Sequence, residues 1–366
     1  MTLTDDICMD RAAALGELGA GFTAPNPMVG CVLVKGGQIV GEGYHPRPGA
    51  DHAEIAALKA AGAEARGAVA YVTLEPCNHY GATPPCTKAL IEAGVAEVVY
   101  AVADPNPLAS GGRETLQAAG IAVRAHPTLA ASRLTDAWRF SLTADRPWVA
   151  AKFAATLDGR VATRGGDSQW ITGPAARARS HDLRQRSGAI VVGVGTVLAD
   201  NPALNPRPEG RAAAETLKVI FDSQARTPPH AACLSSPGPV LLITAEDAPG
   251  AAKSALKESG AHIISVQREN EGLCLRSALH CLRADFGCLS IMVEGGGRLL
   301  GSFADAGLID EVWAFLAPKI LGGGQCAVDG HGPSRIGEAM ALTDVSIEMA
   351  GPDFLIRGRV PRGSES

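Results

Sequence analysis

The sequence predicts two consecutive α/β domains in a soluble protein, and three observations support this. The length of 366 residues exceeds the roughly 100–200 residues of a typical domain. Short apolar runs alternate with amphipathic stretches in both halves of the chain, a pattern typical of layered α/β folds. The alternation weakens over residues 139–146, just before Pro147. We therefore expect one domain at residues 1–145 and a second at residues 146–366.

The first domain is expected to alternate helices and strands around a largely parallel sheet. Apolar residues with helical spacing predict a helix from Asp5 to about Gly19. The next two apolar runs flank Gly36 and Gly37, and this predicts a hairpin over residues 31–40 because glycine readily adopts positive φ. The later elements are helices over 51–61, 87–93 and 115–119, and strands over 69–74, 95–103 and 121–123.

A second α/β pattern begins at Trp148. Apolar runs predict strands over 148–153, 189–194, 219–222, 240–244, 263–266 and 289–293. Between them, helices are predicted over 177–185, 251–258, 273–284 and 299–306. Neither half contains an internal repeat. Each half has its own strands and apolar runs, so each is expected to have its own core.

Composition excludes several classes of function. A net charge of −5 provides no broad basic surface for nucleic-acid phosphates, and 4% aromatic residues leave little for base stacking. The longest apolar run, residues 189–199, is too short to cross a bilayer, and the N-terminus lacks a signal-peptide pattern. Nine cysteines, several inside apolar runs, fit free thiols in a reducing compartment. We expect a cytoplasmic protein with no nucleic-acid and no membrane partner.

The strongest chemical motif is H-A-E at residues 52–54, followed by P-C at 76–77 and P-C at 85–86. One His and two Cys can bind zinc and leave its fourth position for water, whereas structural sites use four protein ligands. A Glu two residues after the His can move that water's protons, as in the zinc-dependent base deaminases. We therefore expect one zinc per chain on His52, Cys77 and Cys86, with Glu54 as the catalytic residue. Isolated Cys and His are more often core residues, but this order and spacing are hard to obtain by chance.

Local structure is expected to assemble this site. His52 and Glu54 are predicted in the first turn of one helix and Cys86 at the start of another, where the positive helix end favours a thiolate. The segment between Cys77 and Cys86 is longer than in ordinary nucleoside deaminases, and this insert distinguishes the chain from them.

Two glycine-rich turns in the second half are candidates for a dinucleotide site. The run V-V-G-V-G at 191–195 follows a strand, but Leu198 breaks the G-x-G-x-x-G pattern, which favours a buried strand turn. The run E-G-G-G-R at 294–298 lies between a strand and a helix, where backbone N–H groups could bind a pyrophosphate and Arg298 could add charge. A tight turn without a ligand is the alternative.

The motifs of both halves together resemble the bifunctional deaminase–reductase family of riboflavin biosynthesis. In chain order they are PNPMVGC at 25–31, HAE at 52–54, TLEPC at 73–77, TPPC at 83–86, DPNP at 104–107, TLDGR at 156–160, DSQWIT at 167–172, GTVLADNP at 195–202, VEGGG at 293–297 and APKILG at 317–322. The resemblance spans nearly the whole chain. It implies an N-terminal cytidine-deaminase-like three-layer α/β domain and a C-terminal dihydrofolate-reductase-like α/β domain.

The resemblance also implies the reactions and the partner. They are zinc-dependent hydrolytic deamination of 2,5-diamino-6-ribosylamino-pyrimidinone 5′-phosphate, then NADPH-dependent reduction of the ribosyl group of 5-amino-6-(5-phosphoribosylamino)uracil to ribityl. The positions matching cofactor contacts are Ala154, Trp170, Thr196, Asp200, Ser223, Gly296, Gly297, Arg298, Leu299, Leu300, Gly301 and Ser302. Those matching substrate contacts are Ser168, Arg184, Leu204, Arg207 and Glu294. The expected partner is a small phosphorylated pyrimidine, and we expect a homo-oligomer.

Several of these residue types suit such roles physically. Arg184 and Arg207 suit a phosphate dianion because a guanidinium binds phosphate bidentately, although a lone Arg is more often a surface charge. Lys152 and Asp158 are further candidates for proton transfer. In the deaminase pocket, Asn26 is the expected polar contact to the substrate.

Two other functions are open from the sequence alone. The second half could have lost catalysis and only support assembly, but intact Glu294, Arg207 and residues 296–302 argue against this. The first half could be a zinc-stabilised binding module without catalysis. That alternative requires a fourth ligand, and the sequence offers none near His52, Cys77 or Cys86.

Overall fold

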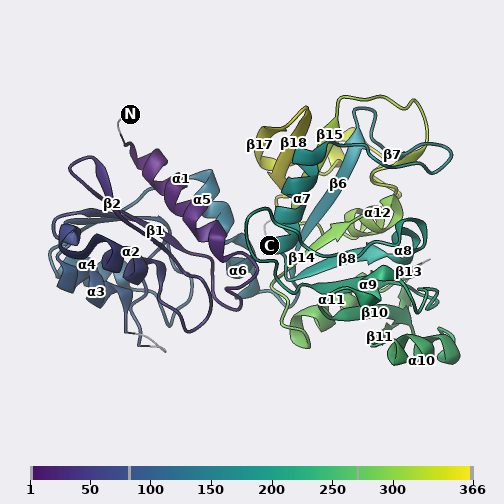
Figure 1. Ribbon diagram of the computed structural model, residues 1–366, viewed down its shortest axis with the longest axis horizontal. Helices are drawn as coiled ribbons and strands as arrows, with labels where there is room; N and C mark the ends of the chain where they lie inside the picture. Colours follow the sequence, from purple (N-terminus) through teal and green to yellow (C-terminus); the bar gives the residue numbers. More distant parts are fainter. Residues whose placement is uncertain (1–2, 81–83, 270–271, 363–366) are drawn as a thin grey trace. The chain divides into compact units, whose positions relative to one another are not determined.

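The computed structural model describes residues 3–80, 84–269 and 272–362, and the chain forms two compact units, Met1–Ala144 and Asp145–Ser366 (Figure 1). Within the described ranges, we find no helix with the length and apolar character needed to cross a membrane. The nine cysteines, all of which lie in these ranges, are free thiols.

The first unit is built on one sheet with the strand order β2-β1-β3-β4-β5. Its strands are β1 Gly30–Lys35, β2 Gln38–Tyr44, β3 Val69–Leu74, β4 Glu97–Val102 and β5 Ala122–Ala125. The β1 strand is antiparallel to both β2 and β3, whereas β3, β4 and β5 are parallel. The expectation of a largely parallel sheet is therefore wrong. The hairpin at Gly36 and Gly37, both with positive φ, reverses the chain and leaves β1 as the neighbour of β3.

Helices cover both faces of this sheet, which confirms the three-layer prediction (Figure 1). The helical elements are α1 Asp5–Gly16, η1 Glu17–Gly19, α2 Ala53–Ala61, η2 Gly62–Ala65, α3 Cys86–Ala93, α4 Gly112–Ala118, α5 Leu129–Leu134 and α6 Asp136–Ser141. One buried cluster joins α1 and α5 to the sheet, for example through Met9 and Ala131. The other joins α2, α3 and α4 through Ala57, Leu90 and Leu116. The segment of weak periodicity before Pro147 overlaps α6.

The position of α2 depends on two glycines of β2. A Cβ atom at Gly41 or Gly43 would collide with the backbone carbonyl oxygens of Ala57 and Ala53, respectively. The helix therefore lies against the strand at backbone distance, which only glycine permits. This contact fixes the start of α2, where the H-A-E motif lies.

The second unit contains a larger sheet with the order β11-β10-β9-β8-β14-β6-β15-β18-β17. Its strands are β6 Trp148–Thr156, β8 Ala189–Gly193, β9 Leu217–Phe221, β10 Val240–Ala245, β11 His262–Val266, β14 Ser290–Glu294, β15 Glu311–Ala317, β17 Thr343–Ala350 and β18 Asp353–Arg359. The strands from β11 to β15 are parallel, and β18 and β17 extend the sheet in antiparallel fashion. No apolar run in the sequence predicted β15, β17 or β18.

Helices pack on both faces of this sheet as well. They are α7 Pro174–Arg186, α8 Val194–Asp200, α9 Ala232–Ser235, α10 Gly250–Glu258, α11 Leu275–Ala284 and α12 Gly297–Asp305, whereas the short helix η3 Ile336–Glu338 is exposed. The buried residues of α11 and α12 share one core with Val191 and Val293, and those of α7 share another with Ile190 and Phe315. Two short strand pairs complete the unit, β7 Arg160–Ala162 with β16 Gln325–Cys326, and β12 Arg268–Glu269 with β13 Gly272–Leu273.

Lys218 on β9 is fully buried, and its ammonium group fastens α9 to the sheet. The Nζ atom donates to the carbonyl oxygens of Cys233 and Ser236 at 2.7 and 2.8 Å, and to Ser236 Oγ at 2.7 Å. We expect Lys218→Met to lower the free energy of unfolding by about 2–4 kcal/mol, because it leaves these buried acceptors without a donor. Denaturant unfolding measures this, with the exposed Lys257→Met on α10 as the control. Equal stability of the two variants would contradict the prediction.

Candidate active sites

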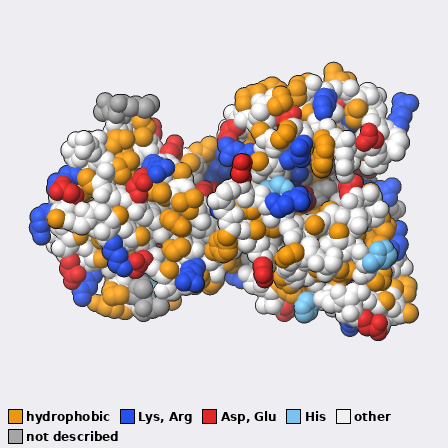
Figure 2. All heavy atoms as spheres, in the orientation of Figure 1, with side chains coloured by type: hydrophobic (Ala, Val, Ile, Leu, Met, Phe, Trp, Pro, Cys, Tyr) orange, Lys and Arg blue, Asp and Glu red, His pale blue; other side chains and the backbone are white. Residues whose placement is uncertain are grey.

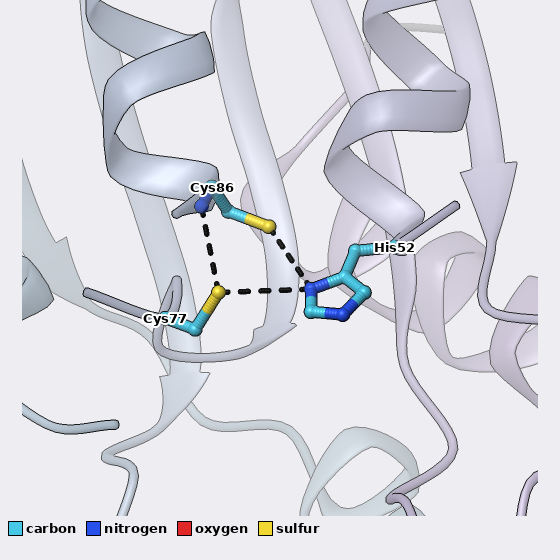
Figure 3. Close-up of side chains that lie close together, drawn as sticks. All are labelled: His52, Cys77 and Cys86. Atoms are coloured by element: carbon cyan, nitrogen blue, oxygen red, sulfur yellow. Dashed lines mark hydrogen bonds between the residues drawn. The ribbon is translucent and has the colours of Figure 1, made fainter. Parts of the chain in front are cut away.

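His52, Cys77 and Cys86 converge in the first unit (Figure 3). His52 is the N-cap residue of α2, Cys77 follows β3, and Cys86 opens α3. Residues 81–83 of the insert, including Thr83 of the TPPC motif, lie outside the described residues. The expectation that His52 lies within the first helical turn is corrected by one position. It has extended backbone angles and precedes the turn, which begins at Ala53 and contains Glu54.

The donor atoms of these three side chains fit a zinc ion. They all lie within 4.8 Å of one another, and His52 Nδ1 is 3.2 Å from Cys86 Sγ and 3.6 Å from Cys77 Sγ. Tetrahedral zinc with ordinary bond lengths separates a nitrogen and a sulfur ligand by roughly 3.6 Å. One nitrogen and two sulfurs are also the donor types that zinc prefers. The cluster therefore has the chemistry and spacing of a three-ligand zinc site.

The environment of the thiols favours a thiolate at Cys77. Hydrogen bonds from the Cys86 thiol, from His52 and from the Cys86 backbone N–H lower the pKa of Cys77. The hydrogen bond that the Cys86 thiol donates to Cys77, together with burial, raises the pKa of Cys86. A thiolate is the form that binds metal.

Glu54 is buried beside this cluster, with 4% of its surface exposed. Burial and the neighbouring Cys77 charge raise its pKa to about 7, against the opposing effect of His52. A carboxyl group with a pKa near neutrality can both accept and return a proton, which is the requirement for a general acid–base.

A cavity of about 400 Å³ opens onto these residues. Its lining includes His52, Glu54 and Cys77, together with Pro25, Asn26, Pro27, Val29, His45, Leu74, Glu75, His79, Asp104, Asn106, Ala109, Trp138 and Leu142. The volume is within the range of pockets that bury a small molecule. The predicted contact Asn26 and the unassigned His79 therefore both lie at the pocket wall.

Sequence reasoning missed several polar residues of this wall. Asn26 Nδ2 lies 3.1 Å from His45 Nε2, and His45 Nδ1 lies 3.0 Å from the Asp51 carbonyl oxygen. Burial lowers the pKa of His45 and raises that of Asp104. Asp104 belongs to the DPNP motif, which could have drawn attention to it. His45 carries no comparable sequence signal.

In the second unit, the predicted contacts gather at the carboxyl edge of the parallel strands. Glu294 is the last residue of β14, Thr196 lies just after β8, and Ser223 lies two residues after β9. Ligands of open α/β sheets bind beyond this edge. Figure 2 shows Lys and Arg side chains and a His around a hollow beside α7.

Glu294 is the centre of a buried charge network. Its Oε1 forms an ion pair with Arg184 Nη2, and its Oε2 lies 3.8 Å from Lys152 Nζ. Burial alone would raise the pKa of Glu294, but the charges of Arg184 and Lys152 outweigh it and the pKa is lowered. Burial lowers the pKa of Lys152. Arg184 also donates from Nη1 to the Asn205 carbonyl oxygen at 3.2 Å, and so joins α7 to the loop that carries Leu204 and Arg207.

The turn after Glu294 brings its backbone close to Thr196. Gly295 and Gly296 have φ values of 76° and 80°, and a Cβ on either would contact Thr196 Oγ1, at 3.1 and 3.5 Å. The helix α12 then begins at Gly297. Its first N–H groups thus open beside Thr196, an arrangement suited to a phosphate group.

Other predicted contacts lie at the edge of this region. Trp170 is 64% exposed, stacks on Arg177 at 4.5 Å, and its carbonyl oxygen accepts from Lys319 Nζ at 2.9 Å. Asp158 accepts from the backbone of Leu321 and Gly322, so it orders a loop. Among the described residues, no side-chain hydrogen bond connects Ser168, Asp200 or Ser223 to the Glu294 network.

Comparison with known proteins agrees with both sites. Residues 4–102 match the cytidine and deoxycytidylate deaminase zinc-binding region, and residues 147–356 match the RibD C-terminal domain. The riboflavin biosynthesis protein RibD of Aquifex aeolicus is 40% identical over 353 residues, covering 95% of this chain and 96% of its own. The structure of Acinetobacter baumannii RibD (form 1) covers 98% of this chain and 99% of its own, with 35% identity and a TM-score of 0.79.

A third relative carries the two activities in its name. It is the diaminohydroxyphosphoribosylaminopyrimidine deaminase/5-amino-6-(5-phosphoribosylamino)uracil reductase of Thermotoga maritima, whose crystal structure matches with a TM-score of 0.80 and 33% identity. The match covers 98% of this chain and 99% of that chain. Both units are therefore matched together, in the same order.

Proposed function

Because the chain belongs to the RibD family of riboflavin-biosynthesis deaminase–reductases, we propose that the His52–Cys77–Cys86 cluster and Glu54 carry its deamination and that the Glu294 network carries its reduction. The enzyme removes the pyrimidine amine of 2,5-diamino-6-ribosylamino-pyrimidinone 5′-phosphate and then reduces the ribosyl group of the product to ribityl. Its cofactors are zinc and NADPH. The observation that carries the proposal is the convergence of three zinc-type donors beside a buried Glu at a cavity of about 400 Å³.

In the deaminase unit, three side chains are proposed as metal ligands and one as the general acid–base. His52, Cys77 and Cys86 would hold zinc, which supplies Lewis-acid activation of water when bound. Glu54 would take one proton from the attacking water and deliver it to the ring nitrogen. It would then take the second proton from the added hydroxyl group and deliver it to the amine, which departs as ammonia while the carbonyl forms. Its raised pKa supports both transfers, because the neutral and charged forms are close in free energy near pH 7.

In the reductase unit, Glu294 would bind the substrate's hydroxyl or amine groups, held in place by Arg184 and Lys152. Thr196, the glycine turn and the start of α12 over residues 296–302 would bind the NADPH phosphates. Trp170, Ala154, Asp200 and Ser223 are proposed as further cofactor contacts. Ser168 and Leu204 are proposed as further substrate contacts.

Arg207 is the proposed ligand of the substrate phosphate. It is exposed, whereas the Arg184 guanidinium is mostly buried and pairs with Glu294. We expect Arg207→Ala to raise KM for the phosphorylated substrate at least tenfold more than for its dephosphorylated form, because a charge-assisted contact contributes about 1.5–3 kcal/mol. NADPH oxidation measures this, with Arg179→Ala on the exposed face of α7 as the control. Equal losses for the two substrates would remove Arg207 from the phosphate site.

We further propose that residues 1–145 form the deaminase domain and residues 146–366 the reductase domain. The proposal is supported by the separate cores of the two units. A homo-oligomer is also proposed, since the edge strand β17 exposes Val345, Ile347 and Met349. Sedimentation analysis tests the assembly. A cytoplasmic location is proposed from the free thiols, and fractionation tests it.

The decisive experiment is turnover of the ribosylamino-pyrimidine substrate with and without NADPH. Ammonia release in both conditions, with NADPH oxidation only after deamination, is the expected result. Ammonia release without any NADPH oxidation would show that the chain is a deaminase whose second unit is inactive as a reductase.

A further inference from the structure

We infer that His181 is a positioning residue of the reductase site, where its imidazole accepts hydrogen bonds from Arg207 and orients that guanidinium for the substrate phosphate. The inference rests on the proposed role of Arg207 and adds a residue that neither the motifs nor the resemblance identified. It concerns how the phosphate site is organised before substrate binds.

His181 contacts one edge of the Arg207 guanidinium, the edge formed by Nε and Nη2. His181 lies on α7, one helical turn before Arg184. Its Nε2 atom is 3.3 Å from Arg207 Nε and 3.2 Å from Arg207 Nη2. One acceptor thus faces two donors of the same side chain, and Nη1 is not used by His181. Because the guanidinium is planar, contact along this edge fixes the direction of the remaining N–H donors, including those on Nη1.

The imidazole can accept only while Nε2 carries no proton. His181 faces the positive charges of Arg184, Arg207 and Lys152, and the negative charge of Glu294 opposes them. Burial and the charges of Arg184 and Arg207 lower the pKa of His181 to about 4, so the ring is neutral at neutral pH. The proton is then on Nδ1, which is buried and has no hydrogen-bond partner in the described part of the chain.

Two residues on the same turn of α7 contact the loop before Pro208. One contacts the loop backbone and the other contacts a side chain. Arg184 donates to the Asn205 carbonyl oxygen and so fixes the backbone. His181 instead contacts the side chain of Arg207, which is exposed. An exposed Arg otherwise has many rotamers, and restricting them before binding lowers the entropic cost of capturing a ligand. A contact needed only for folding would not have to involve the guanidinium.

The test compares His181 variants of the full-length enzyme with NADPH, using the deaminated substrate with and without its phosphate. We expect His181→Leu and His181→Ala to raise KM for the phosphorylated substrate about three- to tenfold, the loss of one hydrogen-bonding partner of a charged group. The kcat and the KM for the dephosphorylated substrate should not change. His181→Gln should stay near wild type, because its amide oxygen can accept from Arg207. His280→Leu on α11, where the His is exposed, is the matched control.

The double variant His181→Leu/Arg207→Ala separates positioning from a general structural effect. If His181 acts through Arg207, removing it should add nothing once Arg207 is absent. Additive losses, or equal losses for both substrates, would overturn the inference. If Arg207→Ala itself fails to discriminate the two substrates, the phosphate assignment is wrong and the inference falls with it. If Arg207→Ala discriminates and both apolar His181 variants do not, only the inference is overturned.

Discussion

Glu54→Gln should abolish ammonia release and leave reduction of the pre-deaminated substrate unchanged. The amide has nearly the shape of the carboxylate but cannot take a proton from water. General acid–base catalysis contributes typically about 10²–10⁴-fold, and here one group serves several proton transfers, so the loss is expected at the upper end of this range. The zinc content should remain near one per chain, since Glu54 is not among the converging donors.

The control for this variant is Glu92→Gln on α3, which makes the same chemical change at an exposed position. It should release ammonia at the wild-type rate. Ammonia assays, metal analysis and NADPH oxidation on the deaminated substrate provide the three readouts. Wild-type deamination by the Glu54→Gln enzyme would remove Glu54 from the mechanism.

Cys77→Ser and Cys86→Ser should each lose both zinc and deamination. A serine hydroxyl stays protonated at neutral pH and is a poor substitute for a thiolate, so the zinc content should fall well below one per chain. The site joins the segment after β3 to the starts of α2 and α3. Because the metal binds the folded first unit, it raises the free energy of unfolding of that unit. The thermal midpoint of the first unit should therefore fall, and added zinc should raise it in the wild type more than in either variant.

Cys281→Ser on α11 is the matched control, because this thiol lies outside the cluster and is only partly buried. It should keep its zinc and its deaminase activity. Reduction of the deaminated substrate should persist in the Cys77 and Cys86 variants. Stoichiometric zinc in both of those variants would show that the ligands are wrongly assigned.

The predictions from sequence succeeded where local chemistry decides the outcome. The Gly36-Gly37 turn forms the predicted hairpin because both positions need positive φ. The H-A-E and P-C motifs were recognisable because His and Cys are uncommon and zinc tolerates few donor sets. The two compact units divide between Ala144 and Asp145, and the assignment of residues 1–145 and 146–366 to the two functional domains stays a prediction.

The failures concern which strands pair and whether they run parallel or antiparallel. The predicted hairpin makes β1 and β2 antiparallel, but no apolar run indicated that β1 also pairs in antiparallel fashion with β3. Only the pairings β3 with β4 and β4 with β5 are therefore parallel in the first sheet. The strand β17 is mostly exposed and owes its conformation to pairing with β18, not to burial of an apolar face. Register and strand order depend on which edges meet, and no local pattern records that.

By itself, the sequence determined the domain classes, the three convergent zinc-type donors and the residues of the E-G-G-G-R turn, because each is a property of residue type and short spacing. Only the tertiary structure decided that Arg184 is paired with Glu294, that His45 lines the deaminase pocket beside Asn26, and that His181 faces Arg207. These contacts join side chains on separate elements. Their geometry comes from packing α7 against its sheet and from pairing β1 with β2, which brings the loop of Asn26 to His45, and the linear order of residues does not contain either arrangement.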